Sequence, residues 1–181
     1  DMMECGILFH KKMELNDIMD VGFSHIEVRS GCESEASMNA AKGIVVSLLE
    51  DLSEIKRQLQ QYRNLEYIVV ETKGCNDLQK MEYFVDEIAD TIKEYKLQVY
   101  VENGCIGSDE TGYYHCVYSE VEMLRKIVCF GKQECGEDSF GICLNIGYAN
   151  LLAQNIRGMI EDFREELCLV HMNDNNGFQN D

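Results

Sequence analysis

Seven short apolar runs, rich in β-branched residues, recur along the chain with polar or helix-like segments between them. The runs span residues 6–9, 25–28, 43–49, 67–70, 98–101, 141–144 and 167–170. Near-continuous hydrophobicity over about four to eight residues is what a strand buried on both faces of a sheet requires. The runs therefore predict seven parallel strands in an α/β core.

Amphipathic segments separate the later strands. In residues 51–63, Leu52, Ile55 and Leu59 recur at spacings of three and four, which places them on one face of a helix. Similar stripes predict helices over residues 77–95, 119–130 and 155–166. The intervals between the first strands are short, so the early helices must be only a turn or two long. Alternation of strand and helix, without a proline- or serine-rich linker, favours a single domain over residues 1–181, either a barrel or a large doubly wound sheet.

Chain length decides how complete such a barrel is. An eight-stranded (β/α) barrel usually needs about 200 to 250 residues, whereas this chain of 181 residues ends just after the seventh predicted strand. We therefore expect a TIM-like (β/α) barrel with seven of its eight strand units, truncated at the C-terminus. The open edges of the first and seventh strands would then be covered by residues outside this chain or by a partner, such as a second copy in a homo-oligomer.

The charge and hydropathy of the chain argue against nucleic-acid and membrane partners. The chain has 33 acidic and 16 basic residues, a net charge of −17, and scattered Lys and Arg, so it should repel nucleic acids and anionic membranes. No apolar stretch approaches the roughly 20 residues that cross a bilayer, and the N-terminus lacks a signal-peptide pattern. The nine cysteines form no CxxC pair and several lie in apolar runs, which favours reduced thiols. We expect a soluble, cytoplasmic protein.

Polar side chains stand where the predicted strands end. Glu102 follows the fifth strand, Asn145 the sixth and His171 the seventh. The carboxyl ends of parallel strands meet at one face, so a carboxylate, a carboxamide and an imidazole come together there and could hold a divalent cation. Asp181 offers a further oxygen ligand.

Two more carboxylates should point to the same mouth of the barrel. Glu27 lies at the end of the second predicted strand and Glu71 at the end of the fourth. Burying a carboxylate is costly unless another group pairs with it, so carboxylates in these positions are candidates for binding a substrate.

In this order and spacing, the segments resemble the xylose isomerase-like TIM barrels, which include sugar-phosphate isomerases and epimerases and the apurinic endonucleases. The resemblance runs through residues 22–27, 101–103, 143–149 and 171–175, nearly the whole chain. It implies that Glu102 is both a metal ligand and an acid/base group, and that His171 and Asp181 are ligands. The implied activity is that of a metal-dependent sugar or sugar-phosphate isomerase or epimerase.

The chain departs from the family pattern on its sixth strand and on its third and fourth strands. The sixth strand of the family usually carries Asp and, three residues later, His, whereas this chain has Asn145 and Tyr148. An amide oxygen brings no charge, and a phenol with a reference pKa near 10 is a poor ligand at neutral pH. The histidines of the endonucleases on the third and fourth strands are also missing, so we expect one weak site for Mn, Co, Mg or Zn, or none.

The mechanism that the resemblance implies is proton transfer next to a carbonyl. The metal would polarise the carbonyl while Glu102 moves the proton through an enediolate-like intermediate. The remaining polar groups at the mouth would contact the small-molecule sugar or sugar phosphate, namely Glu27, Glu71, Tyr148 and Asp174.

Two other classes of function stay open. Asn145 and Tyr148 favour a catalytically impaired barrel that binds a sugar or a protein partner. An apurinic endonuclease-like repair enzyme is less compatible with the sequence, because of the charge of −17 and the missing histidines.

Overall fold

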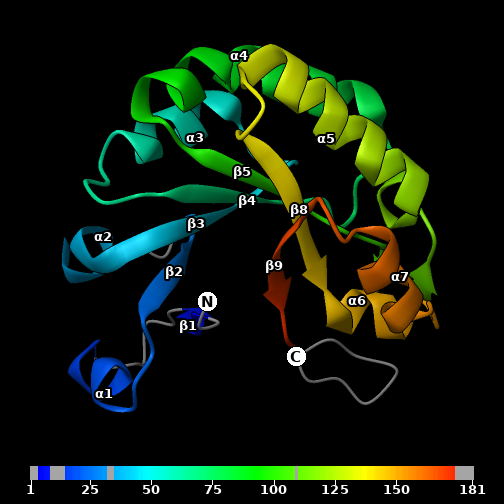
Figure 1. Cartoon of the computed structure of the whole chain (residues 1–181), viewed down its shortest axis with the longest axis horizontal. Helices are drawn as coiled ribbons and strands as arrows, with labels where there is room; N and C mark the ends of the chain where they lie inside the picture. The colour runs from blue at the N-terminus through cyan, green and yellow to red at the C-terminus, as the bar shows by residue number, and fades with distance from the viewer. Residues whose placement is uncertain (1–3, 9–14, 32–34, 109, 174–181) are drawn as a thin grey trace.

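Seven parallel strands form one sheet in the computed structural model, which describes residues 4–8, 15–31, 35–108 and 110–173 (Figure 1). The strands are β1 (Gly6–Leu8), β2 (His25–Arg29), β3 (Ala41–Ser47), β4 (Tyr67–Glu71), β5 (Gln98–Glu102), β8 (Phe140–Asn145) and β9 (Leu167–His171). They lie side by side in chain order, and each neighbouring pair is parallel. Each of the seven predicted strands is confirmed.

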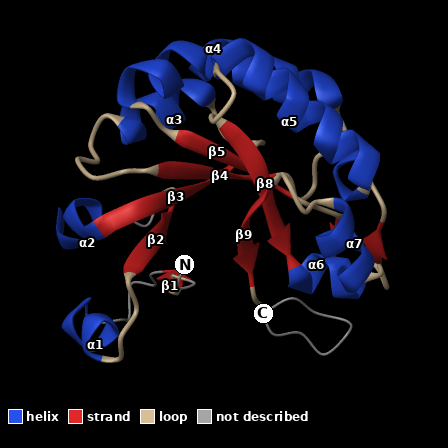
Figure 2. Ribbon diagram, viewed as in Figure 1, coloured by secondary structure: helices blue, strands red, loops and turns tan. Residues whose placement is uncertain are grey.

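The sheet curls into an incomplete barrel. Helices form an outer arc around the curled strands, and β1 and β9 stand at the opening of that arc (Figure 2). The strands β1 and β9 stand at the two ends of the strand order, and among the described residues neither pairs with the other. The prediction of a seven-unit α/β barrel is confirmed.

Helices follow most of the strands. They are α1 (Leu15–Asp20), α2 (Glu35–Ala40), α3 (Leu52–Leu59), α4 (Leu78–Tyr95), α5 (Val121–Cys135), α6 (Ile146–Leu151) and α7 (Ile156–Asp162), with a short 3₁₀ turn at Val117–Ser119. The first two have six residues each, as the short early intervals predict.

The bounds of three helices differ from the prediction, and one of them, α7, ends at Asp162 rather than at residue 166. The helix α3 stops at Leu59, because the chain tightens into a turn in which the N–H of Gln61 donates to the carbonyl of Gln58 at 2.8 Å. The helix α5 continues past Gly131, where the apolar stripe suggested an end. The ring of Phe140 packs against Gly131 and leaves no room for a Cβ atom, so this glycine serves helix-to-strand packing rather than termination.

Three short elements were not predicted. The six-residue α6 directly follows β8, and the three-residue strands β6 (Ile106–Ser108) and β7 (Gly112–Tyr114) form an antiparallel hairpin after β5. These elements are too short to show a clear apolar period. They matter because they add side chains to the mouth of the barrel.

Alternation along the strands divides the core in two. On β3, Ile44 and Val46 face the helices, whereas Val45 faces the barrel interior. The interior cluster is small and consists of Val45, Tyr67, Val69 and Cys143, with Tyr100 and Leu169 packed against it. Because side chains alternate, the strand residues that follow on the interior face at the carboxyl ends are polar, and this layer of side chains is the floor of the candidate site.

The described residues contain no helix that is long and apolar enough to cross a bilayer. Their eight cysteines are free thiols. Cys143 is buried, as its apolar run predicts, whereas Cys5 and Cys168 are exposed. The difference arises because Cys5 adjoins β1 and Cys168 lies in β9, the two edge strands.

Candidate active site at the mouth of the barrel

Three predicted residues meet at the mouth through one imidazole. Nδ1 of His171 lies 2.6 Å from Oε1 of Glu102, and Nε2 lies 2.8 Å from Oε2 of Glu27. The two carboxylate side chains are only 3% and 6% exposed, respectively, and the imidazole is 17% exposed. The end of β9 therefore places one ring between the carboxylates of β5 and β2.

Each carboxylate has a further hydrogen-bond donor. The hydroxyl of Tyr67 donates to Oε1 of Glu27 at 2.7 Å, and Nδ2 of Asn145 donates to Oε1 of Glu102 at 3.1 Å. These contacts fix both carboxylates in the interior, where an unpaired charge would be costly.

Asn145 is placed by the start of α6. Its Oδ1 accepts a hydrogen bond at 3.1 Å from the N–H of Tyr148, so Asn145 is the N-cap of that helix. Its backbone N–H donates to Oδ1 of Asn103 at 2.6 Å, which ties β8 to the end of β5. The side chain of Asn145 therefore presents its nitrogen, not its oxygen, to Glu102.

Glu71 and Tyr148, predicted to contact substrate, lie in a second polar group at the mouth. The guanidinium of Arg29 donates to both carboxylate oxygens of Glu71 at 3.0 and 3.1 Å. The Tyr148 hydroxyl is 3.4 Å from the same carboxylate. Arg29 was missed in the sequence, although it lies two residues after Glu27 in β2 and alternation places both on the interior face.

The pKa values in this network favour a charged imidazole. Burial raises the pKa of Glu27, but the hydrogen bond and positive charge of His171, with the hydrogen bond from Tyr67, bring it below its ordinary value of 4.5. Burial lowers the pKa of His171, yet hydrogen bonds with Cys143, Glu102 and Glu27 raise it well above 6.5. Burial raises the pKa of the Cys143 thiol to about 12 despite its hydrogen bond with His171, so that thiol is neutral at pH 7. The carboxylates are therefore the groups that balance the imidazolium.

The donor set at the mouth fits a divalent cation. Glu102, Cys143 and His171 each offer one ligand atom, and these atoms lie within 4.8 Å of one another. Carboxylate, thiolate and imidazole ligands suit Zn²⁺ and related ions. In the metal-free state the two buried carboxylates balance the imidazolium of His171, so a divalent cation would bind there only in exchange for the protons of His171 and Cys143. Cys143 was missed as a candidate because a cysteine within an apolar run is typical of a core thiol.

Asp174 and Asp181 lie outside the described residues, and their assignment as a substrate contact and a metal ligand stays a prediction.

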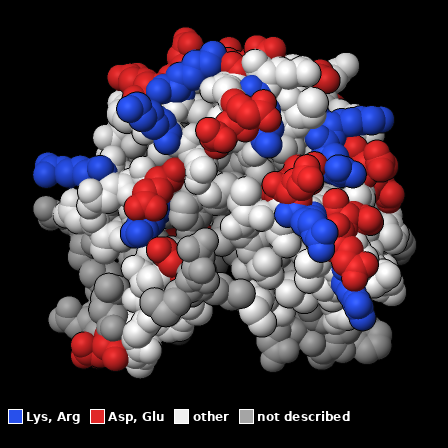
Figure 3. Space-filling view, in the orientation of Figure 1, with Lys and Arg blue, Asp and Glu red and all other residues white. Residues whose placement is uncertain are grey.

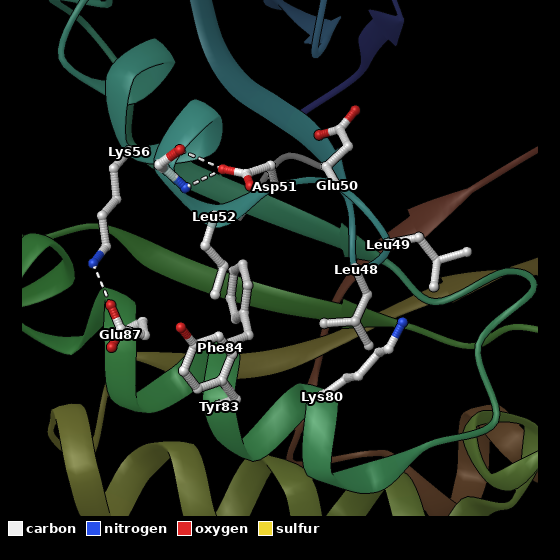
Figure 4. Close-up of a pocket in the computed structure, with 11 residues that line it drawn as sticks. Leu48, Leu49, Glu50, Asp51, Leu52, Lys56, Lys80, Tyr83, Phe84 and Glu87 are labelled. Carbon is white, nitrogen blue, oxygen red and sulfur yellow. Dashed lines mark hydrogen bonds and ion pairs between the residues drawn. The ribbon is translucent and has the colours of Figure 1, made fainter.

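Two cavities lie elsewhere on the molecule. One of about 430 Å³ lies between α3 and α4, where Lys56 and Glu87 form an ion pair at 2.7 Å (Figure 4). Another of about 610 Å³ lies at the amino ends of the strands, beside Gln98 and Ser139. Neither includes a predicted site residue, so the polar network at the carboxyl ends of the strands remains the candidate site.

Acidic and basic side chains of the described residues are interspersed on the face shown in Figure 3, and these residues form no continuous basic patch on it. Nucleic-acid phosphates are usually bound by such patches.

Comparisons with known proteins identify the fold. No protein-family model matches the sequence, and a search of curated proteins finds no match. Among solved structures, 3-keto-D-glucoside 4-epimerase from E. coli aligns with a TM-score of 0.67 and 14% identity over 96% of this chain and 80% of that one. A xylose isomerase domain protein from Alicyclobacillus acidocaldarius aligns with a TM-score of 0.57 and 10% identity, over 96% and 74% of the two chains.

A third solved structure, endonuclease IV from Thermus thermophilus, aligns with a TM-score of 0.54 and 13% identity over 95% of this chain and 77% of that one. At such identities the likeness concerns the fold alone. The parallel seven-stranded sheet and these three alignments together show that the chain has the fold of the xylose isomerase-like TIM barrels.

Proposed function

We propose that this protein is a sugar or sugar-phosphate isomerase or epimerase that transfers a proton at a carbon next to a carbonyl. One observation carries the proposal: two buried carboxylates, Glu27 and Glu102, approach one imidazole from opposite sides at the mouth of the barrel. Paired acid and base groups are what such a proton transfer needs.

The roles follow from the placement of the groups. Glu102 is the base that takes the proton from the substrate carbon, and the bonding electrons move toward the carbonyl oxygen to give an enediolate-like intermediate. The positive charge of His171 stabilises the negative charge that develops on this oxygen. In an isomerisation Glu102 returns the proton to the neighbouring carbon, whereas in an epimerisation a second acid must protonate the same carbon from the opposite face of the intermediate.

Glu27 lies on the other side of His171 from Glu102, and its short contact with the ring orients the imidazole. Glu71 and Tyr148 supply hydrogen-bonding groups for sugar hydroxyls at the same mouth. A group that orients another contributes to catalysis by holding the reacting atoms at the distance and orientation that the reaction needs.

Once His171 and Cys143 release their protons, Glu102, His171 and Cys143 would hold a divalent ion, whose charge would replace that of the imidazolium. Bound there, the ion would supply Lewis-acid polarisation of the carbonyl. A sulfur ligand favours Zn²⁺ or Co²⁺ over Mg²⁺. Asn145 would join the ligands only after its oxygen leaves the N–H of Tyr148.

The second candidate function is that of a barrel that binds a sugar without converting it. The observation in its favour is that both imidazole nitrogens of His171 contact carboxylates, and the Asn145 oxygen caps α6. An endonuclease-like function has less support, because the chain has a net charge of −17 and the described residues on the face in Figure 3 form no continuous basic patch.

Deuterium exchange tests the proposal. The protein is incubated with fructose or fructose 6-phosphate in D₂O, with and without Mn²⁺, Co²⁺ or Zn²⁺, and deuterium at the carbons next to the carbonyl is followed by NMR. We expect exchange in the parent protein and a loss of at least about a hundredfold in Glu102→Gln, since a positioned acid/base group contributes about 10²–10⁴-fold.

Glu66→Gln is the matched control, because Glu66 precedes β4 at the opposite end of the sheet and its side chain is 59% exposed. This control should exchange as the parent does. Sugar binding without exchange in the parent would reject the isomerase and favour the binding-only barrel.

A further inference from the structure

Lys73 stands in a loop that is held against the end of β5. The hydroxyl of Thr72 donates to the carbonyl of Glu102 at 2.8 Å, and the N–H of Gly74 donates to the carbonyl of Cys105 at 2.9 Å. Gly104 passes so close to Thr72 that a Cβ atom at residue 104 would collide with it. The backbone on both sides of Lys73 is therefore fixed next to the strand that carries Glu102.

The ammonium of Lys73 lies over two tyrosine rings. Its Nζ is 5.9 Å from the ring centroid of Tyr113 in β7 and 5.7 Å from that of Tyr148 in α6. Both distances are within the range of cation–π attraction. Two elements that were not predicted, the β6–β7 hairpin and α6, therefore supply the faces between which this cation is held.

Lys73 has no carboxylate partner among the residues that the structure describes. The lysines with ion pairs there are Lys42, Lys56 and Lys132. Ring faces attract a cation but accept none of its three N–H groups in the way an oxygen does. Other described lysines also have no ion pair, but Lys73 is the half-buried one held at the mouth of the barrel between two rings, where a ligand can reach its ammonium.

The nearby carboxylate of Glu71 is already neutralised. Arg29 donates to both of its oxygens, and the hydroxyl of Tyr148 approaches it at 3.4 Å. Tyr148 contacts both groups through different parts of its side chain: its hydroxyl is directed to Glu71, while its ring faces the ammonium of Lys73. The positive charge of Lys73 is left for a group that comes from outside the protein.

We propose that Lys73, held between Tyr113 and Tyr148, binds the phosphate group of a sugar-phosphate substrate. Both arginine and lysine bind phosphate, lysine as a point charge with three donors. Arg29 is committed to Glu71, so among the described residues Lys73 is the cation left at the mouth for a phosphate. The inference rests on the proposed function for the sugar part of the ligand. It selects the phosphorylated substrate over the neutral sugar.

Equilibrium binding tests the inference without any need for turnover. Inorganic phosphate, fructose 6-phosphate, fructose and gluconate are titrated by calorimetry into the parent protein and into Lys73→Met, Lys73→Gln and Lys73→Arg. Lys126→Met is the matched control, since Lys126 is exposed on α5. We expect Lys73→Met and Lys73→Gln to bind phosphate and fructose 6-phosphate about tenfold or more weakly, as loss of a hydrogen bond to a charged group predicts.

In the same experiment, Lys73→Arg should retain most of the affinity, Lys126→Met should match the parent, and fructose should bind all variants equally. Equal affinity of the parent for fructose and fructose 6-phosphate, or unchanged phosphate binding in Lys73→Met and Lys73→Gln, would overturn the inference. Gluconate binding as tightly as fructose 6-phosphate, with the same dependence on Lys73, would reject the assignment to phosphate.

Deuterium exchange separates this inference from the proposed function. If Lys73→Met loses phosphate binding while the parent shows no exchange, the phosphate site stands and the isomerase does not. If the parent exchanges fructose and fructose 6-phosphate equally well and Lys73→Met does the same, the isomerase stands and the phosphate site does not.

Discussion

Nε2 of His171 lies 2.8 Å from Oε2 of Glu27, although the two residues are 144 positions apart in the sequence. The strands that carry them, β9 and β2, do not pair with each other: β9 is one edge of the curled sheet and β2 is the neighbour of β1, the other edge. The other nitrogen of the same ring contacts Glu102 on β5. One imidazole thus connects the two sides of an incomplete barrel at its mouth.

Removing this imidazole should destabilise the metal-free protein. His171→Ala leaves Glu27 and Glu102 buried without their shared cation, and loss of one partner of a buried ion pair costs about 3–5 kcal/mol. Urea denaturation of the chelator-treated protein measures the free energy of unfolding. His115→Ala, whose side chain is 54% exposed, should change it by less than about 0.5 kcal/mol. Equal effects of the two substitutions would contradict the network.

Stability of the chelator-treated protein should fall in acid. The folded-state pKa of Glu27 lies below 4.5, so the stabilisation from its carboxylate is full above pH 4.5 and is lost as the pH falls through the folded value. The pKa of His171 is raised above 6.5, so its contribution is full below pH 6.5 and persists through neutral pH. Urea denaturation from about pH 3 to pH 8 should show the parent and Glu27→Gln converging below pH 4.5, and a constant difference would argue against the pair.

The sequence was most informative about the strands. A parallel strand buried on both faces needs an unbroken apolar run, so the seven runs identified the sheet and the residues at its carboxyl ends. Alternation also indicates which side chains face the interior. It does not show which interior side chains meet, so the contact of Glu27 with His171 and the pairing of Arg29 with Glu71 became visible only in the structure.

Lys73 was missed for a related reason. Its significance comes from Tyr113 and Tyr148, which belong to a hairpin and a helix too short to leave a periodic signal. A lysine in a loop carries no indication in the sequence of what its side chain contacts.

Metal binding should depend on two of the predicted ligands. We expect the chelator-treated protein to bind one Zn²⁺ or Co²⁺, and Glu102→Gln and His171→Ala to lose this binding, because each removes a ligand from a small donor set. Cys143→Ala should weaken Zn²⁺ more than Mn²⁺, since sulfur is the softer ligand. Calorimetry measures the affinities, with Glu66→Gln as a control that should bind normally. Absence of binding by the parent would favour the binding-only barrel.

Two asparagine caps allow the bond to Glu102 to be measured by itself. Asn145 caps α6 and also donates to Glu102, whereas Asn155 caps α7 through the N–H of Gly158 at 3.1 Å. Asn155→Ala should cost about 1 kcal/mol. Asn145→Ala should cost about 2–3 kcal/mol, because a hydrogen bond to a charged group is lost as well. Urea denaturation gives both values, and equal losses would mean that the bond to Glu102 contributes nothing.

The distance in sequence between Glu27 and His171 has a consequence for biosynthesis. A ribosome releases β2 early and β9 much later. The carboxylate of Glu27 is therefore present in the nascent chain long before the imidazole of His171, its partner in the folded protein, has been synthesised. Closing a loop of that length is among the slowest contacts to form in a chain of this size. The polar network should therefore be among the last parts of this sheet to mature, and its assembly would report that β2 and β9 have both reached their places.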